Sequence, residues 1–228
     1  MPHNNFAFSK NLSFGAIPAD LVDTIRASNS DRIIRMRCID DFYNVLLELE
    51  DYRNQGELTM LKNYCGSFVH FVTEYLLQDD QKDIKIIFSA IKAIRLVLKY
   101  NDMEIDEHLI KVLQGRINFR KLLEALADLL NDPKEVVRNE IQLLIIYISK
   151  FMAPKNLVTL LIQQLEYPRY MEHGKQHLLN IVTLILLKHN EDLKLKQRKE
   201  PVFQEIPQWG ETAEAGVGRE ELQIYNKD

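Results

Sequence analysis

The chain has 228 residues, of which 46% are hydrophobic and 27% are charged, a balance typical of a folded globular protein. Its formal net charge of −4 gives no general attraction to nucleic acid or anionic lipid. Only 8 Gly and 7 Pro argue against a turn-rich β-sandwich. No apolar run has the length of a membrane-spanning helix, and Met1–Lys10 lacks the apolar core of a signal peptide. We therefore expect a cytoplasmic or cytoskeletal protein that binds neither nucleic acid nor a membrane.

Two cysteines, Cys38 and Cys65, both lie in apolar helical patterns. This placement predicts buried free thiols in a reducing compartment, with a disulfide as the alternative. Two cysteines alone do not make a zinc site.

In chain order, apolar residues at helical spacing predict four pairs of helices, each pair joined by a short loop. Two stripes are clearest: Ile87, Ile91, Ile94 and Leu98, and Ile141, Leu144, Ile145 and Ile148. The predicted pairs are Ile17–Arg26 with Met36–Leu49, Leu61–Gln78 with Ile84–Tyr100, Phe119–Leu130 with Val136–Phe151, and Pro154–Leu165 with Lys175–His189. A single pair cannot bury its apolar face, so neighbouring pairs are expected to stack into a continuous core.

The third loop carries the sharpest helix-start signal. Asp132 suits an N-cap, Pro133 suits the first helical position, and Glu135 completes an arrangement like a capping box. These residues predict a helix that begins directly after Asp132.

Basic residues enter the second helix of each pair, at spacings near the period of about 40 to 47 residues typical of HEAT repeats. Insertions at Glu50–Thr59 and Asn101–Asn118 interrupt this period. The predicted fold is all-α: a HEAT/armadillo-like α-solenoid, TOG-like, with about four helical-hairpin repeats. Its predicted parts are an N-terminal extension (1–10), the array (11–192), and a linker with an extended tail (193–228). In the tail, Phe203 and Trp209 are expected to dock onto the array or onto a partner.

No constellation of catalytic residues emerges from the sequence. There is no phosphate-binding loop, and no Ser or Cys has a His in a recognisable nucleophile setting. His173 and His177 have a spacing that could chelate a metal, but no third ligand accompanies them, so surface or packing roles are favoured. His70, among apolar neighbours, is expected to lie in the core. We expect no enzymatic activity, no cofactor and no metal.

In a solenoid, equivalent loops lie side by side and form one edge. The basic residues expected along that edge are Arg32, Arg35, Lys82, Lys85, Lys134, Arg138, Arg169 and Lys175. Aspartates and glutamates in the same loops dilute this charge. One interpretation is ordinary solvated charge with helix capping. The other is a modest basic edge for an acidic protein surface, which would raise the association rate more than the affinity.

Two segments near the N-terminus resemble the opening of a TOG domain: Asn11–Leu21 (NLSFGAIPADL) and Cys38–Leu46 (CIDDFYNVL). They are most similar to the TOG domains of the crescerin family, the TOG array regulators of axonemal microtubules. Leu157–Leu165 is similar to the middle repeats of that family. The chain departs from the pattern in two respects: Asn29–Arg32 offers no aromatic residue in the first loop, and the predicted array stops after about four repeats.

The resemblance implies a paddle of HEAT repeats whose intra-repeat loops, here at Arg35, Lys85 and Arg138, contact tubulin. The leading hypothesis is a non-catalytic protein of the cilium or axoneme that binds tubulin or the microtubule lattice. The alternative is a HEAT-type adaptor for another protein. The sequence does not fix an oligomeric state.

Overall fold

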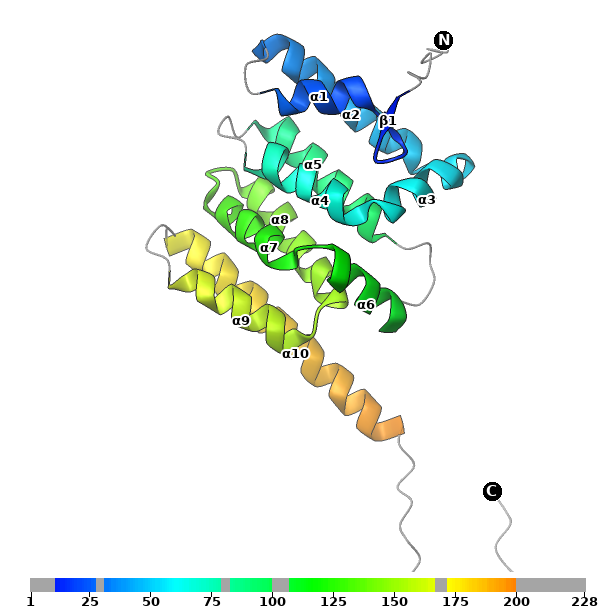
Figure 1. Cartoon of the computed structure of the whole chain (residues 1–228). Helices are drawn as coiled ribbons and strands as arrows, with labels where there is room; N and C mark the ends of the chain where they lie inside the picture. Colours follow the sequence, from blue (N-terminus) through cyan, green and yellow to red (C-terminus); the bar gives the residue numbers. More distant parts are fainter. Residues whose placement is uncertain (1–10, 28–30, 79–82, 100–106, 167–171, 200–228) are drawn as a thin grey trace, which may run out of the picture.

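The computed structural model describes residues 11–27, 31–78, 83–99, 107–166 and 172–199, and 85% of the described residues are helical (Figure 1). The predicted all-α class is thereby confirmed. The helices are α1 (Ala19–Arg26), α2 (Arg32–Leu49), α3 (Gln55–Asn63), α4 (Cys65–Val72), α5 (Ile84–Leu98), α6 (Glu107–Arg116), α7 (Phe119–Asp128), α8 (Glu135–Ile148), α9 (Pro154–Leu165) and α10 (Glu172–Lys199). The shorter helical turns are η1 (Tyr52–Asn54), η2 (Thr73–Leu77), η3 (Leu129–Asn131) and η4 (Ser149–Phe151).

A small β-hairpin precedes the first helix. β1 (Leu12–Ser13) pairs antiparallel with β2 (Ile17–Pro18), and Phe14 and Gly15 at the turn have positive φ. The turn places the Phe14 ring 5.3 Å from that of Phe68 on α4, edge to face. Because Ile17 and Pro18 belong to the hairpin, the prediction that the first helix starts at Ile17 is wrong by two residues.

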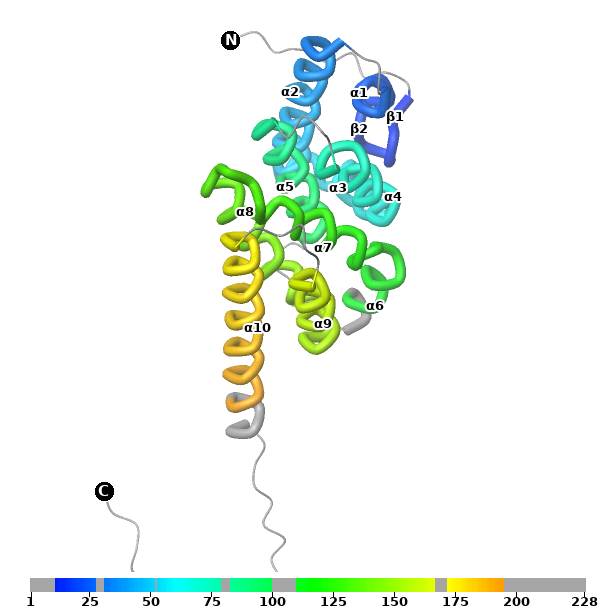
Figure 2. The backbone as a smooth tube through the Cα atoms, turned by 90° about the vertical axis from the view of Figure 1, so that its left-hand side faces the viewer, coloured from blue at the N-terminus to red at the C-terminus, as the bar shows by residue number. Residues whose placement is uncertain are grey.

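The long helices pack as four successive pairs: α1 with α2, α4 with α5, α7 with α8, and α9 with α10. Each second helix also contacts the next, in the order α2, α5, α8, α10. Figure 2 shows these four helices along one side of the molecule, with α1, α4, α7 and α9 along the other. The predicted pairing of the helices is therefore present in the described residues.

Helix α5 lies at the centre of this packing. It contacts α2, α4, α8 and η2, and its apolar residues are buried on most of its circumference, from Ile86 and Ile87 to Val97 and Leu98. A helix that is apolar nearly all round is stable in water only when neighbours cover it. The layers on either side of α5 supply that cover.

The two segments predicted as insertions are partly helical. The first contains η1 and the start of α3, and the second contains α6, which contacts α4 and η4. The helix predicted over Leu61–Gln78 is interrupted at Tyr64, where α3 ends and α4 begins. The first helix of the second predicted pair is thus divided into short helices.

Helix α8 begins two residues later than its sequence signal suggests. The helix starts at Glu135, while Asp132 caps the end of η3 and accepts a hydrogen bond from the backbone N–H of Lys134 (2.8 Å). Pro133 therefore lies in the turn and not at the first helical position. Asp132 still accepts from a backbone N–H, as an N-cap residue does, but it stabilises the turn that precedes α8 and not the first turn of the helix.

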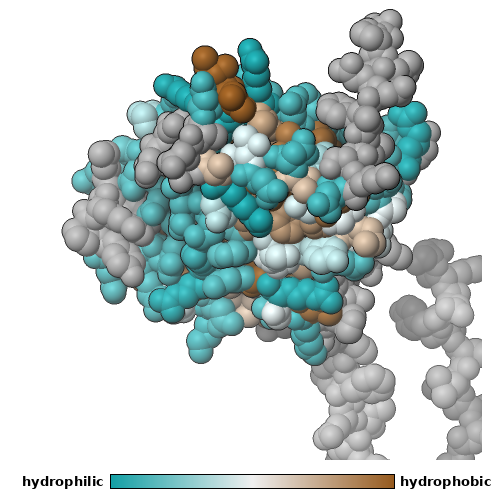
Figure 3. Space-filling model, turned by 45° about the horizontal axis from the view of Figure 1, so that its top comes forward, coloured by the Kyte–Doolittle hydropathy of each residue, from teal (hydrophilic) through white to brown (hydrophobic). Residues whose placement is uncertain are grey.

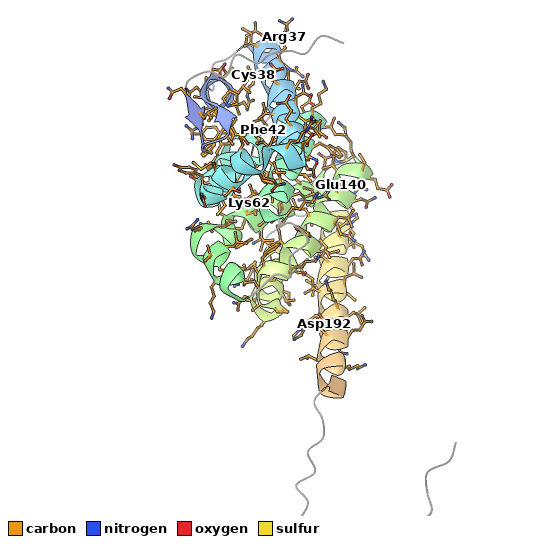
Figure 4. The ribbon with its side chains drawn as sticks, turned by 90° about the vertical axis from the view of Figure 1, so that its right-hand side faces the viewer. Arg37, Cys38, Phe42, Lys62, Glu140 and Asp192 are labelled. Carbon is orange, nitrogen blue, oxygen red and sulfur yellow. The ribbon has the colours of Figure 1, made fainter. Side chains whose placement is uncertain are left out.

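Helix α10 continues to Lys199, beyond the predicted start of the tail at Leu193. Its last part, on which Asp192 lies, projects from the rest of the molecule (Figures 1 and 4). The segment is rich in Leu, Lys, Gln and Arg, which favour helix even where no layer packs against it. Among the described helices, none combines the length and apolar character needed to cross a membrane.

Gly66 offers a test of the contact between α4 and α6. A Cβ at this position would overlap the backbone carbonyl of Arg116, whereas a Cβ at Gly115 in α6 would meet nothing within 4 Å. We expect Gly66→Ala to lower the free energy of unfolding by about 1 to 3 kcal/mol through overpacking. Gly115→Ala, the matched control, should raise it by about 0.5 to 1 kcal/mol. Urea denaturation measures both, and equal midpoints for the two variants would contradict the close approach of these helices.

Candidate functional site

The loop-flanking ends of the four helix pairs lie on one side of the molecule, at the left of Figure 1. We call this side the hairpin edge and define it by the N-terminal ends of the second helices: Arg32–Arg35, Asp83–Lys85, Asp132–Arg138 and Glu172–Lys175. Lys82 and Arg169, predicted to lie in the loops, are outside the described residues, as are Phe203 and Trp209 of the tail. The other six predicted basic residues can be placed.

Aspartates shape the first three turns of the hairpin edge. Each carboxylate accepts a hydrogen bond from the backbone N–H two residues further on, at 2.7 to 2.9 Å; the three are Asp31, Asp83 and Asp132. Such bonds satisfy donors that the helix itself leaves unpaired. The carboxylates of these three aspartates, which dilute the positive charge of the loops, therefore serve as hydrogen-bond acceptors for backbone N–H groups.

Three of the predicted basic residues hold neighbouring layers together. The Arg35 guanidinium donates to the carbonyl of Tyr75 in η2 (3.2 Å), and the Lys85 ammonium pairs with both carboxylate oxygens of Asp40 on α2 (3.1 Å). Both contacts join the first pair to the second. Arg35 is half-buried, whereas Lys85 and Asp40 are exposed, so their ion pair contributes little to stability.

Arg138 makes the densest of these contacts. Its Nη1 donates to the carbonyls of Asp132 (2.7 Å) and Pro133 (3.0 Å), and its Nε donates to Nε2 of His177 on α10 (3.2 Å). The guanidinium thus ties the third turn and the fourth pair to α8. It is half-buried, and its position is explained by packing.

The remaining basic residues face solvent. Arg32, Lys134 and Lys175 are exposed, and none of them forms an ion pair with a side chain that the structure describes. They come from α2, the third turn and α10, so they are spread along the hairpin edge. These three are the predicted residues best placed to meet a partner.

Apolar side chains accompany them, and sequence reasoning missed these. Ile33 and Ile34 are 64% and 53% exposed beside Arg32, and Val136 is 51% exposed beside Lys134. The buried stripe of α2, which includes Ile39, Phe42, Leu46 and Leu49, extends back to positions 35 and 36 at helical spacing. Ile33 and Ile34 lie off that stripe, which is the signal that would have identified them. Figure 3, which views the molecule from its top, shows hydrophobic side chains in small separate groups on a mostly hydrophilic surface.

The histidines fit structural roles. His177 accepts from Arg138 at Nε2, while its Nδ1 lies 3.1 Å from Oε1 of Gln142, an arrangement that requires the neutral ring with the proton on Nδ1. His173 lies 3.4 Å from the carbonyl of Asn131. The prediction that His70 lies in the core is wrong, because its side chain is exposed on the outer face of α4. Among the described residues, no group of three or more His, Cys, Asp or Glu could hold a metal ion, and Cys38 and Cys65 are free thiols.

Replacing Arg138 tests its role within the fold. We expect Arg138→Ala to lower the free energy of unfolding by about 1 to 3 kcal/mol, because two turn carbonyls and His177 lose a charged donor. Lys134→Ala, on the same turn but exposed, should change it by less than about 0.5 kcal/mol. Chemical denaturation checks both variants. Equal stability of Arg138→Ala and the parent chain would show that the guanidinium does not hold the layers.

His177 should make stability depend on pH. Burial, followed by the charges of Arg138 and His173, lowers the pKa of His177 below its usual 6.5, against the smaller opposite effect of Glu135. Because folding depresses the pKa of His177, its neutral ring stabilises the fold in full above about pH 6.5. This stabilisation is lost as pH falls through the lower pKa of the folded state. His177→Gln should therefore lose less stability than the parent chain between pH 7.5 and pH 5, as measured by urea midpoints. His70→Gln is the exposed control, and an identical pH dependence for His177→Gln and the parent would refute the assignment.

Comparisons of the chain with protein-family models, with curated proteins and with solved structures find no match. The resemblance of the opening segments to TOG domains therefore remains an interpretation of the sequence. What the protein does has to be inferred from its fold, its exposed side chains and their charges.

Proposed function

We propose that the chain is a non-catalytic helical-repeat protein of the HEAT type that binds a protein partner along the hairpin edge. The resemblance of the opening segments to TOG domains indicates tubulin, free or in the microtubule lattice of a cilium or axoneme, as that partner. Four helix pairs in chain order, with their loop-flanking ends on one side, support the repeat architecture.

One observation carries the choice of the hairpin edge: the exposure of Ile33 and Ile34 next to Arg32 at the end of α2. Two adjacent β-branched apolar side chains gain nothing for the isolated fold at more than half exposure. Apolar and arginine side chains are the usual anchors of protein interfaces. These isoleucines occupy the region where TOG domains usually carry an aromatic residue, so they could supply the apolar contact in its place.

Charge at the hairpin edge suits an acidic partner surface. Arg32, Lys134 and Lys175 extend into solvent, while the nearby Asp31 and Asp132 carboxylates are bound to backbone N–H groups. Exposed charges of this kind raise the association rate and make it sensitive to salt. The affinity itself would come from the apolar anchors.

A second candidate is a HEAT-type adaptor that binds a protein other than tubulin. The contacts of Arg35, Lys85 and Arg138 with other parts of the chain favour it, because the resemblance to TOG domains assigned these positions to tubulin contacts. Reversing their charge would disturb the layers and therefore cannot separate the two functions. Binding of the parent chain to tubulin separates them, and substitution of the exposed isoleucines tests the hairpin edge as the site.

The test is the double variant Ile33→Ser/Ile34→Ser. We expect it to weaken binding to tubulin, in gel filtration, or to microtubules, in co-sedimentation, by at least about tenfold, since two interface anchors are lost. Because both side chains are exposed, its thermal unfolding should match that of the parent. Leu187→Ser, at a 56% exposed leucine of α10 outside the hairpin edge, is the control and should bind normally.

Failure of the parent chain to bind tubulin and microtubules at low salt would remove tubulin as the partner. Equal binding by the double variant and the parent would remove the hairpin edge as the site.

A further inference from the structure

A second surface lies on the same helices, away from the hairpin edge. A groove with a volume of about 620 Å³ runs across α2, α5 and α8, and its walls come from the parts of these helices that follow their first turns. The hairpin edge is formed by their N-terminal ends, so the two surfaces share no residue. The groove is large enough to take several side chains of a peptide.

The apolar part of the groove is built from aromatic and aliphatic side chains. Phe88 and Tyr147 are half-buried, and the Tyr147 hydroxyl donates to the carbonyl of Leu98 (3.2 Å), which fixes its ring. Leu143 on α8 stands 54% exposed at the wall. A fixed aromatic surface with an exposed leucine beside it offers a partner apolar area at little ordering cost.

Ion pairs cross the groove, and cations exceed carboxylates among its described lining residues. Glu50 accepts from both Lys92 and Lys99, the latter at 3.4 Å, while Arg95 pairs with Glu140 at 2.8 Å. The hydrogen bond from Lys92 lowers the pKa of Glu50, which keeps this carboxylate charged. One carboxylate thus serves two lysines.

Lys99 is the most exposed of the three cations that line the groove. The Lys99 ammonium is 60% exposed and makes the longer of the two bonds to Glu50. An incoming carboxylate could therefore join Lys99 without displacing a buried ion pair.

We propose that this groove binds a short acidic peptide segment of a partner protein, with an apolar side chain seated on Phe88 and Leu143 and a carboxylate paired with Lys99. The cations of the groove favour an acidic residue of the peptide, and the apolar wall favours an apolar residue next to it. The inference goes beyond the hairpin edge and does not depend on tubulin being the partner there.

Fluorescence anisotropy with a labelled Glu-Glu-Leu-Glu-Glu-Leu-Glu-Glu peptide tests the proposal. The parent chain should bind this peptide at least about tenfold more tightly than the same peptide with Lys for Glu, or with Ser for Leu, and rising salt should weaken binding. Leu143→Ser and Lys99→Glu should each weaken it at least about fivefold. Lys155→Glu and Leu187→Ser, exposed changes outside the groove, are controls and should leave it unchanged.

The double variant Ile33→Ser/Ile34→Ser should keep full affinity for this peptide, which separates the groove from the hairpin edge. No preference for the acidic peptide, or equal binding by Leu143→Ser, would overturn the proposal. Analytical ultracentrifugation tests whether a second copy of the chain fills the groove, because it measures the oligomeric state. A parent dimer that Leu143→Ser converts to monomer would mean that a second copy fills the groove, and would equally overturn it.

Discussion

The burial of α5 between α2 and α8 is the constraint on which the rest of the structure depends. Its apolar circumference needs cover on several sides, and the layers before and after it in the chain provide that cover. Once α5 is enclosed, the second helices have a fixed order and their N-terminal ends are held on one side of the molecule. The hairpin edge and the groove are both consequences of this arrangement.

The same three helices thus present two chemically different surfaces. At their N-terminal ends, aspartates are bound to backbone N–H groups and Lys85 and Arg138 tie the layers together, which leaves Ile33 and Ile34 with exposed cations. Further along, ion pairs and aromatic rings border the groove. Under the two proposals made above, each surface would hold a different partner. Neither surface requires a change in the packing of the core.

Sequence periodicity predicted the four helix pairs because α5 and α8 carry continuous apolar stripes that are buried in the structure. It missed α6 and the start of α3, whose apolar faces are short, and α6 packs against α4 and η4, which are distant in sequence. The contacts of Arg35 and Lys85 with other layers could not be predicted, because periodicity gives the face of a helix but not the neighbour that it meets. The exposed isoleucines, in contrast, could have been recognised as lying off the stripe of α2.

Hydrogen–deuterium exchange with and without tubulin would show whether the hairpin edge is a binding surface. We predict slower exchange at the N-terminal ends of α2 and α8, around Ile33 and Val136, with no change over Leu184–Leu193 of α10. Slower exchange confined to α10, or none anywhere with tubulin in saturating excess, would contradict it.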